Sequence, residues 1–223
     1  MSIPILINGK SGSGKSRSIV GLNPIETFII ASLAKDLPIK GWKRKYTNLS
    51  KDGGNYIVTD DYEKIDKTLA YISDKRPEIK TVVIDDSQYL MANEFMRRHS
   101  KVGGGNAVFS LYNDIGDHFW HLVMSMRLFR QDLIIIMLHH SETSEIGETK
   151  AKTIGKMLDD KIVVEGMFSI VLNTLVENGQ YFFETQTSGF NTTKSPEGMF
   201  AEKRIPNDLN LVIQSIHKYN TEE

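Results

Sequence analysis

The segment from Gly9 to Ser16 constrains this chain most, because it reads Gly-Lys-Ser-Gly-Ser-Gly-Lys-Ser. It matches the phosphate-loop pattern G-x-x-x-x-G-K-[ST] completely, and the apolar run at residues 3–8 before it is typical of a buried strand. Glycines allow the backbone to curl, so that consecutive N–H groups converge on an anion. The segment predicts a strand, a loop for the phosphates of a nucleoside triphosphate, and a helix from Lys15.

The side chains of this loop have distinct expected roles in binding the nucleotide. Lys15 would reach the β- and γ-phosphates, and the Ser16 hydroxyl would hold Mg²⁺. ATP and Mg²⁺ are therefore the expected cofactors. The residues expected to contact the nucleotide are Gly9, Lys10, Ser11, Gly12, Ser13, Gly14, Lys15, Ser16 and Arg17.

A second buried strand is expected to end in acidic residues. Residues 81–84 are strand-favouring, and Asp85 and Asp86 follow them directly. Asp85 is expected to face Ser16 and to serve the Mg²⁺, directly or through its hydration shell. Asp86 could orient the attacking water. Alternatively, Asp86 and Ser87 only cap the helix that is expected from Gln88.

Composition places the chain in an ordinary globular class. Of its 223 residues, 40 % are hydrophobic and 25 % are charged, which suits one α/β domain spanning 1–223. The absence of cysteine indicates a reducing, cytoplasmic setting, and no basic leader predicts secretion. The longest apolar run, Leu133 to Leu138, is too short to span a membrane, so no membrane contact is expected. Because the formal net charge is −1, nucleic-acid contacts would need local basic patches.

Apolar runs alternate with amphipathic stretches, which predicts a mostly parallel, twisted sheet flanked by helices. Strands are expected at 27–31, 81–85 and 133–138, and helices at 62–72 with Thr59 as cap, at 88–98, at 108–129 and at 207–218. Residues 33–56 resemble an inserted loop or hairpin, and 141–160 a mobile loop leading into a short helix. Residues 168–176 and 181–185 predict a β-hairpin, with Asn178-Gly179 as a type I′ turn.

This order of parts resembles the RecA-type recombinase core, and most closely the short RecA-like ATPases encoded by phages. The stretches 191–200 and 205–209 look like the C-terminal signature of that group. The resemblance implies a RecA-like P-loop fold and a DNA-dependent ATPase that assembles on single-stranded DNA as a filament or ring. It further implies a role in recombination or annealing in the host cytoplasm, beside a single-strand-binding protein.

The same resemblance implies roles for strand-end and late-loop residues. His139 or His140 holds the place of the polar residue that senses the γ-phosphate, where the recombinases usually have glutamine; alternatively, it is a strand-end histidine that meets solvent. Lys194 is the candidate for a cation presented to a neighbouring subunit's γ-phosphate, with Lys203 and Arg204 in reserve. Alternatively, Lys194 is a surface lysine in a flexible loop.

Two loops are implied to face single-stranded DNA, one over 97–106 and one over 141–156. Their cations are Arg97, Arg98, Lys101, Lys150, Lys152 and Lys156. A third cluster, which includes Lys43 and Arg44, interleaves cations with aromatic residues. The alternatives are charge-mixed solvated loops for the first two segments, and an edge hairpin or a platform for the nucleotide base for the third.

Two other classes of function fit a phosphate loop in a chain of this length. A small-molecule kinase of the nucleotide-kinase type needs an arginine-rich lid, but residues 141–160 contain no arginine. A loader or switch protein that binds ATP to dock on a replication or packaging partner stays open. Dependence of turnover on DNA separates the three classes.

Overall fold

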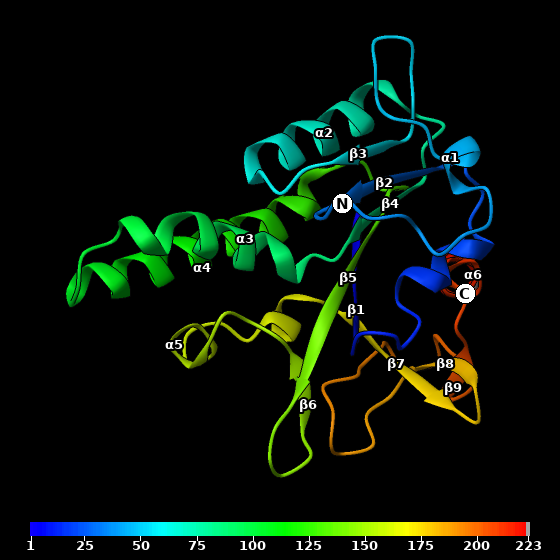
Figure 1. Ribbon diagram of the computed structural model, residues 1–223. Helices are drawn as coiled ribbons and strands as arrows, with labels where there is room; N and C mark the ends of the chain where they lie inside the picture. The colour runs from blue at the N-terminus through cyan, green and yellow to red at the C-terminus, as the bar shows by residue number, and fades with distance from the viewer. Residues whose placement is uncertain (222–223) are drawn as a thin grey trace.

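The computed structural model describes residues 1–221 and places its nine strands in one sheet (Figure 1). The strand order is β3-β2-β4-β5-β1-β7-β8-β9, and β6 pairs with the far end of β5. The first six strands of this order run parallel, whereas β6, β8 and β9 pair antiparallel. The strands are β1 (Ile3–Gly9), β2 (Thr27–Ala31), β3 (Tyr56–Val58), β4 (Thr81–Asp85), β5 (Ile134–Thr143), β6 (Thr149–Ala151), β7 (Ile170–Glu177), β8 (Gln180–Glu184) and β9 (Arg204–Pro206).

Helices cover both faces of this sheet, which is why its central strands are apolar on both sides. One hydrophobic cluster packs the sheet against α2, α3 and α4, and a second cluster packs the opposite face against α6 (Figure 1). We call these the α2–α4 face and the α6 face. Side chains alternate between them, as where Leu6 joins the first cluster and Ile5 and Ile7 join the second. The helices are α1 (Trp42–Lys45), α2 (Tyr62–Lys75), α3 (Gln88–Arg98), α4 (Asn106–Ser125), α5 (Lys156–Asp159) and α6 (Leu209–Thr221).

The predicted α/β class and the late hairpin are confirmed. β7 pairs with β8, and the two turn residues, Asn178 and Gly179, have φ of 50° and 75°. Positive φ at both central positions is what a type I′ turn requires. The tip of this hairpin consequently lies beyond the carboxyl end of β1, because β7 is the direct neighbour of β1.

The helix predicted from Lys15 is a short 3₁₀ helix in the structure. Residues Ser16–Gly21 form a single 3₁₀ helix, and Leu22 is already extended. Pro24 follows closely, and a proline disfavours helical conformation in the residue before it. The loop therefore leads into one short turn, which packs against α6.

The cap of α2 also differs from the prediction. Asp61 caps this helix, because its carboxylate accepts a hydrogen bond from the Lys64 N–H at 3.0 Å. The Thr59 hydroxyl instead accepts from the Asp61 N–H at 3.3 Å. Thr59 therefore shapes the entry to the helix without capping it.

Much of the segment predicted as a mobile loop is a second hairpin. β5 continues to Thr143 and pairs antiparallel with β6, with Ser141 opposite Ala151 and Thr143 opposite Thr149. Gly147 lies in the connecting turn with φ of 87°, a conformation that glycine adopts without steric cost. The predicted short helix is present as α5.

The carboxyl ends of β1, β4 and β5 meet at one edge of the sheet, because the three strands are parallel and β5 lies between the other two. This edge gathers the phosphate loop, the acidic pair and both histidines. Ligands of open parallel sheets bind outside this edge. None of the helices within residues 1–221 is long and apolar enough to cross a membrane.

Candidate functional site

The phosphate loop is held closed by its own lysine. Lys15 Nζ donates hydrogen bonds to the carbonyls of Gly9 at 2.7 Å and Lys10 at 2.9 Å. Gly12 and Gly14 have φ of 77° and 99°, which lets the chain curl around the amine. Burial lowers the pKa of Lys15 to about 8, although nearby carboxylates oppose the shift. The amine is therefore mainly cationic at neutral pH and is centred in the loop.

Ser16 and Asp85 meet across the sheet edge, as the sequence predicts for a metal site. The Ser16 hydroxyl lies 2.8 Å and 3.0 Å from the two carboxylate oxygens of Asp85. Burial, and then the adjacent charge of Asp86, raise the pKa of Asp85 to about 6. These hard oxygen ligands fit Mg²⁺, which commonly takes one or two protein ligands and completes its shell with phosphate oxygens and water.

The described residues offer no metal site built from protein side chains alone. Within residues 1–221, no group of three or more His, Cys, Asp or Glu side chains could hold a metal ion. The donor set at this edge is therefore suited to Mg²⁺ that arrives with a phosphate ligand, and Asp85 and Ser16 are the residues that would hold it.

Asp86 connects two basic side chains, Lys35 and His140. The sequence predicted a role for His140 without linking it to Asp86, and it did not indicate Lys35. The Asp86 carboxylate forms an ion pair with Lys35 and lies 3.2 Å from His140 Nε2. Burial alone would raise the pKa of Asp86, but hydrogen bonds from His140 and Lys35 lower it below the ordinary value. Asp86 also has φ of 60°, which turns the chain sharply after β4. Lys35 follows β2, the neighbour of β4, so reasoning from parallel strand ends could have found it.

The two histidines point to opposite faces of the sheet, since neighbours on a strand alternate. His140 is on the α6 face with Leu138 and lies in the cavity beside Asp86. His139 is on the α2–α4 face and is fully buried. Its ring contacts Ser87 Oγ at 2.9 Å and the Lys152 carbonyl at 2.8 Å. Of the two sensor candidates, His140 is thus the one at the cavity.

The partners of His139 fix its protonation. The Lys152 carbonyl can only accept, so His139 Nε2 carries the proton, and Nδ1 accepts from the Ser87 hydroxyl. Burial lowers the pKa of His139 to about 4, so the ring is neutral at physiological pH. Ser87 consequently serves His139 and does not cap α3, where no side-chain cap is present.

A pH-dependent stability is expected from this buried imidazole. Its pKa falls from the ordinary 6.5 to about 4 on folding, so the unfolded chain binds a proton that the folded chain does not. As pH drops from 6.5 to 4, wild type should lose about 3 kcal/mol of unfolding free energy through this group. The His139→Gln variant lacks the titrating group, and chemical denaturation at both pH values should show a smaller decline. Equal declines in the two proteins would contradict the assignment.

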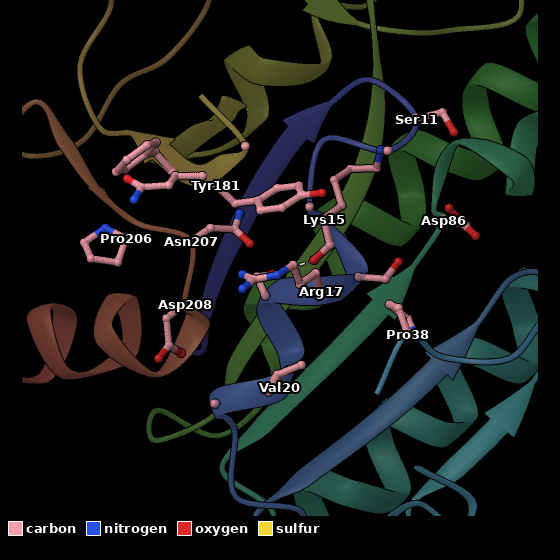
Figure 2. Close-up of a pocket in the computed structure, with 18 of the residues that line it drawn as sticks. Ser11, Lys15, Arg17, Val20, Pro38, Asp86, Tyr181, Pro206, Asn207 and Asp208 are labelled. Atoms are coloured by element: carbon pink, nitrogen blue, oxygen red, sulfur yellow. Dashed lines mark hydrogen bonds between the residues drawn. The ribbon is translucent and has the colours of Figure 1, made fainter. Parts of the chain in front are cut away.

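A cavity of about 970 Å³ opens between the phosphate loop and the late hairpin (Figure 2). Figure 2 shows Ser11, Lys15 and Asp86 at one end, and Tyr181, Pro206, Asn207 and Asp208 along the other wall. Arg17 lies between the two parts, with its guanidinium 4.8 Å from the centroid of the Tyr181 ring. The cavity therefore has Lys15 at one end, where phosphates are expected, and a wall of aromatic and polar side chains beyond it.

The nine predicted nucleotide contacts divide into three groups in the structure. Six of them line this cavity: Ser11, Gly12, Gly14, Lys15, Ser16 and Arg17. Lys10 and Ser13 instead line a second cavity of about 570 Å³ on the other side of the loop. Gly9 is needed for packing, because a Cβ there would lie 1.8 Å from Thr174 Oγ1 on β7.

The wall formed by Tyr181, Pro206 and Asn207 was not predicted from the sequence. These residues belong to β8, β9 and the segment before α6, which reach the phosphate loop only because β7 pairs with β1. The Asn178-Gly179 turn was a visible signal for the hairpin. No local sequence pattern indicated that β7 of this hairpin pairs with β1.

Several cations predicted to contact DNA are already paired with carboxylates. Arg97 pairs with Asp60, Arg98 with Glu94 and Asp114, and Lys150 with Asp159 at 2.7 Å. Lys43 pairs with Asp36 at 3.2 Å and stacks on Trp42. The remaining predicted cations, Arg44, Lys101, Lys152 and Lys156, are exposed.

These segments do not form one surface. Figure 1 shows α1, which carries Lys43 and Arg44, on the opposite side of the molecule from the far end of the α3–α4 pair. The hairpin β5–β6 and α5, which carry Lys150, Lys152 and Lys156, lie in a third place (Figure 1). The DNA-binding assignments stay predictions. A single short DNA strand is not expected to contact all three segments at once.

The cations after the late hairpin do not line the 970 Å³ cavity. Lys194 is exposed, and its backbone bridges to Val171 on β7. Arg204 pairs with Glu177 and lies over the ring of Phe182. The Lys203 carbonyl accepts from the Thr185 N–H. A role for Lys194 in a neighbouring subunit's site stays a prediction.

A parallel α/β sheet with a phosphate loop after β1, a serine and an aspartate facing each other, and a cavity beside them defines a P-loop nucleoside triphosphatase fold. A protein-family model described as an AAA domain matches residues 1–205, so the chain belongs to that family. A search of curated proteins finds no match. Family and geometry agree on a nucleotide-binding ATPase-type domain.

Proposed function

We propose that this protein is an Mg²⁺-dependent ATPase whose turnover is stimulated by single-stranded DNA and which supports recombination or strand annealing. ATP binding rests on the family and on the phosphate loop with Ser16 and Asp85. Dependence on DNA rests on a separate observation, the connection between the acidic strand end and the β5–β6 hairpin.

That connection passes through the neutral His139. Its ring joins Ser87, the residue after Asp86, to the carbonyl of Lys152, the residue after β6. The Lys152 N–H in turn donates to the His140 carbonyl at 2.8 Å. Hydrogen bonds thus tie the hairpin to both sides of the site, so a ligand that shifts the hairpin would also shift Asp86 and His140.

The chemistry of the hairpin end suits a nucleic-acid backbone. Lys152 and Lys156 are exposed cations. Gly155 between them has φ of 142°, a conformation that favours glycine, and the lack of a Cβ leaves the backbone accessible there. Cations that neutralise phosphates give affinity without sequence preference. The resemblance to RecA-type proteins points the same way. It also favours self-association as a filament or ring, a single-strand-binding protein as partner, and a cytoplasmic setting.

The test is ATP turnover with and without oligo-dT over a range of protein concentrations. We expect turnover to rise with oligo-dT and to increase more than linearly with protein concentration, because assembly on DNA would complete the sites. Equal turnover with and without DNA at every concentration would contradict the proposal and would favour a loader or switch function.

A double variant, Lys152→Ala with Lys156→Ala, locates the DNA contact. It should lower the stimulation by oligo-dT at least tenfold and reduce the salt dependence of DNA binding, because two phosphate contacts are lost. The matched control is Lys51→Ala, an exposed cation in the Ser50–Gly53 turn, which should keep full stimulation. Full stimulation in the double variant would place the DNA elsewhere.

A further inference from the structure

Asn207 has a buried amide without a partner. Its side chain is 5 % exposed, and neither Oδ1 nor Nδ2 has a hydrogen-bond partner within residues 1–221. Buried amides are nearly always satisfied in native proteins, since leaving one unpaired is costly. An orphaned amide in the wall of a cavity therefore indicates a ligand that supplies the missing partners.

The position of Asn207 indicates which part of a ligand it would meet. It lines the 970 Å³ cavity next to Tyr181, on the wall that β8 and β9 form beside the phosphate loop (Figure 2). A Cβ built at Gly14 would lie 2.7 Å from a Tyr181 ring carbon and 3.0 Å from Asn207 Oδ1. Glycine at this point of the loop thus allows both side chains to approach it closely. Beyond them, the cavity continues along Pro206 and Asp208, away from Lys15.

The segment that carries Asn207 is held firmly. The Asn207 N–H donates to the Tyr181 carbonyl at 3.2 Å, and Asp208 Oδ1 accepts from the Asn210 N–H at 2.9 Å at the start of α6. Tyr181 belongs to β8, which pairs with β7 and β9, and the Arg17 guanidinium lies over its ring. The amide is therefore presented by a rigid wall, as a recognition group should be.

We propose that Asn207 binds the nucleoside of the nucleotide, with Tyr181 beside it, and that this wall distinguishes a nucleoside triphosphate from bare polyphosphate. The inference rests on the proposed nucleotide site. A primary amide offers one acceptor and two donors, which suit the polar edge of a base or the hydroxyls of a ribose. Tyr181 adds an aromatic surface to the same wall.

The experiment compares the binding of Mg²⁺-ATP and Mg²⁺-tripolyphosphate by calorimetry. For Asn207→Ala, we expect affinity for ATP to fall about tenfold and affinity for tripolyphosphate to stay as in wild type. Asn210→Ala is the matched control, because Asn210 lies one turn further on, in α6, and does not line the cavity. It should bind both ligands as wild type does.

The outcomes separate this inference from the proposal of a nucleotide site. Equal ATP affinity in wild type and Asn207→Ala would overturn the role of Asn207 and leave a buried water as its partner. Failure of wild type to bind either ligand would overturn the nucleotide site itself. If the alanine variant does not fold, Asn207→Asp keeps the shape but loses the amide donors, and the same tenfold selective loss is expected.

Discussion

Replacing Lys15 with alanine is expected to lower ATP turnover by about 100-fold or more, the loss typical of removing one preorganised charge-stabilising donor. Lys15 is the buried cation at the centre of the loop, and its amine is held between the carbonyls of Gly9 and Lys10. Phosphate release at saturating ATP measures the effect. Lys51→Ala again serves as the control and should retain wild-type turnover.

The folded state of the Lys15→Ala variant needs its own readout, because the lysine also holds the loop together through the carbonyls of Gly9 and Lys10. Its thermal unfolding without nucleotide should remain a single transition, since the substitution removes two hydrogen bonds within the loop and nothing from the two hydrophobic clusters. A folded variant with turnover within about threefold of wild type would contradict the assignment of the catalytic loop.

Replacing Asp85 with asparagine is expected to change stability and function in opposite directions. Burial raises the pKa of Asp85 from the ordinary 3.8 to about 6, so ionising this carboxyl costs more free energy in the folded protein than in the unfolded chain. The neutral amide removes this cost, and the nucleotide-free variant should gain up to about 3 kcal/mol of unfolding free energy at pH 7.5. Mg²⁺-dependent turnover should fall about 100-fold, because the metal loses its charged ligand.

Two measurements check the Asp85→Asn prediction. Chemical denaturation without nucleotide reports stability, and a titration of turnover with Mg²⁺ reports the metal site. The same pKa implies that wild-type affinity for Mg²⁺ should weaken as pH falls below about 6, because the proton then competes with the metal. If the Asp85→Asn variant is less stable and keeps the wild-type Mg²⁺ dependence, Asp85 has only a structural role.

The parts of the site that follow directly from local sequence were predictable. The loop from Gly9 to Ser16 and the acid Asp85 each follow an apolar strand, and parallel strands bring their carboxyl ends together. Strand alternation could also have chosen between the histidines. Counting from the buried Leu138 places His140 on its face, while His139 falls on the other.

The parts that depend on distant pairing were not predictable from one sequence. Tyr181 and Asn207 reach the phosphate loop because β7 pairs with β1, and no local pattern fixes that neighbour. The β5–β6 hairpin was missed because β6 has only three residues and the end of β5 that pairs with it is polar, so both segments resemble a loop in the sequence. The short 3₁₀ helix after the loop is consistent with Pro24, which disfavours helical structure just before it. This proline is visible in the sequence and argues against the long helix that usually follows a phosphate loop.

The most direct test of the central claim is the binding of ATP to wild type by calorimetry, with Mg²⁺ and with excess EDTA. The geometry of Lys15, Ser16 and Asp85 predicts one ATP per chain and an affinity at least tenfold higher with Mg²⁺ than with EDTA. Absence of binding up to millimolar ATP in the presence of Mg²⁺ would contradict the nucleotide site and every proposal built on it.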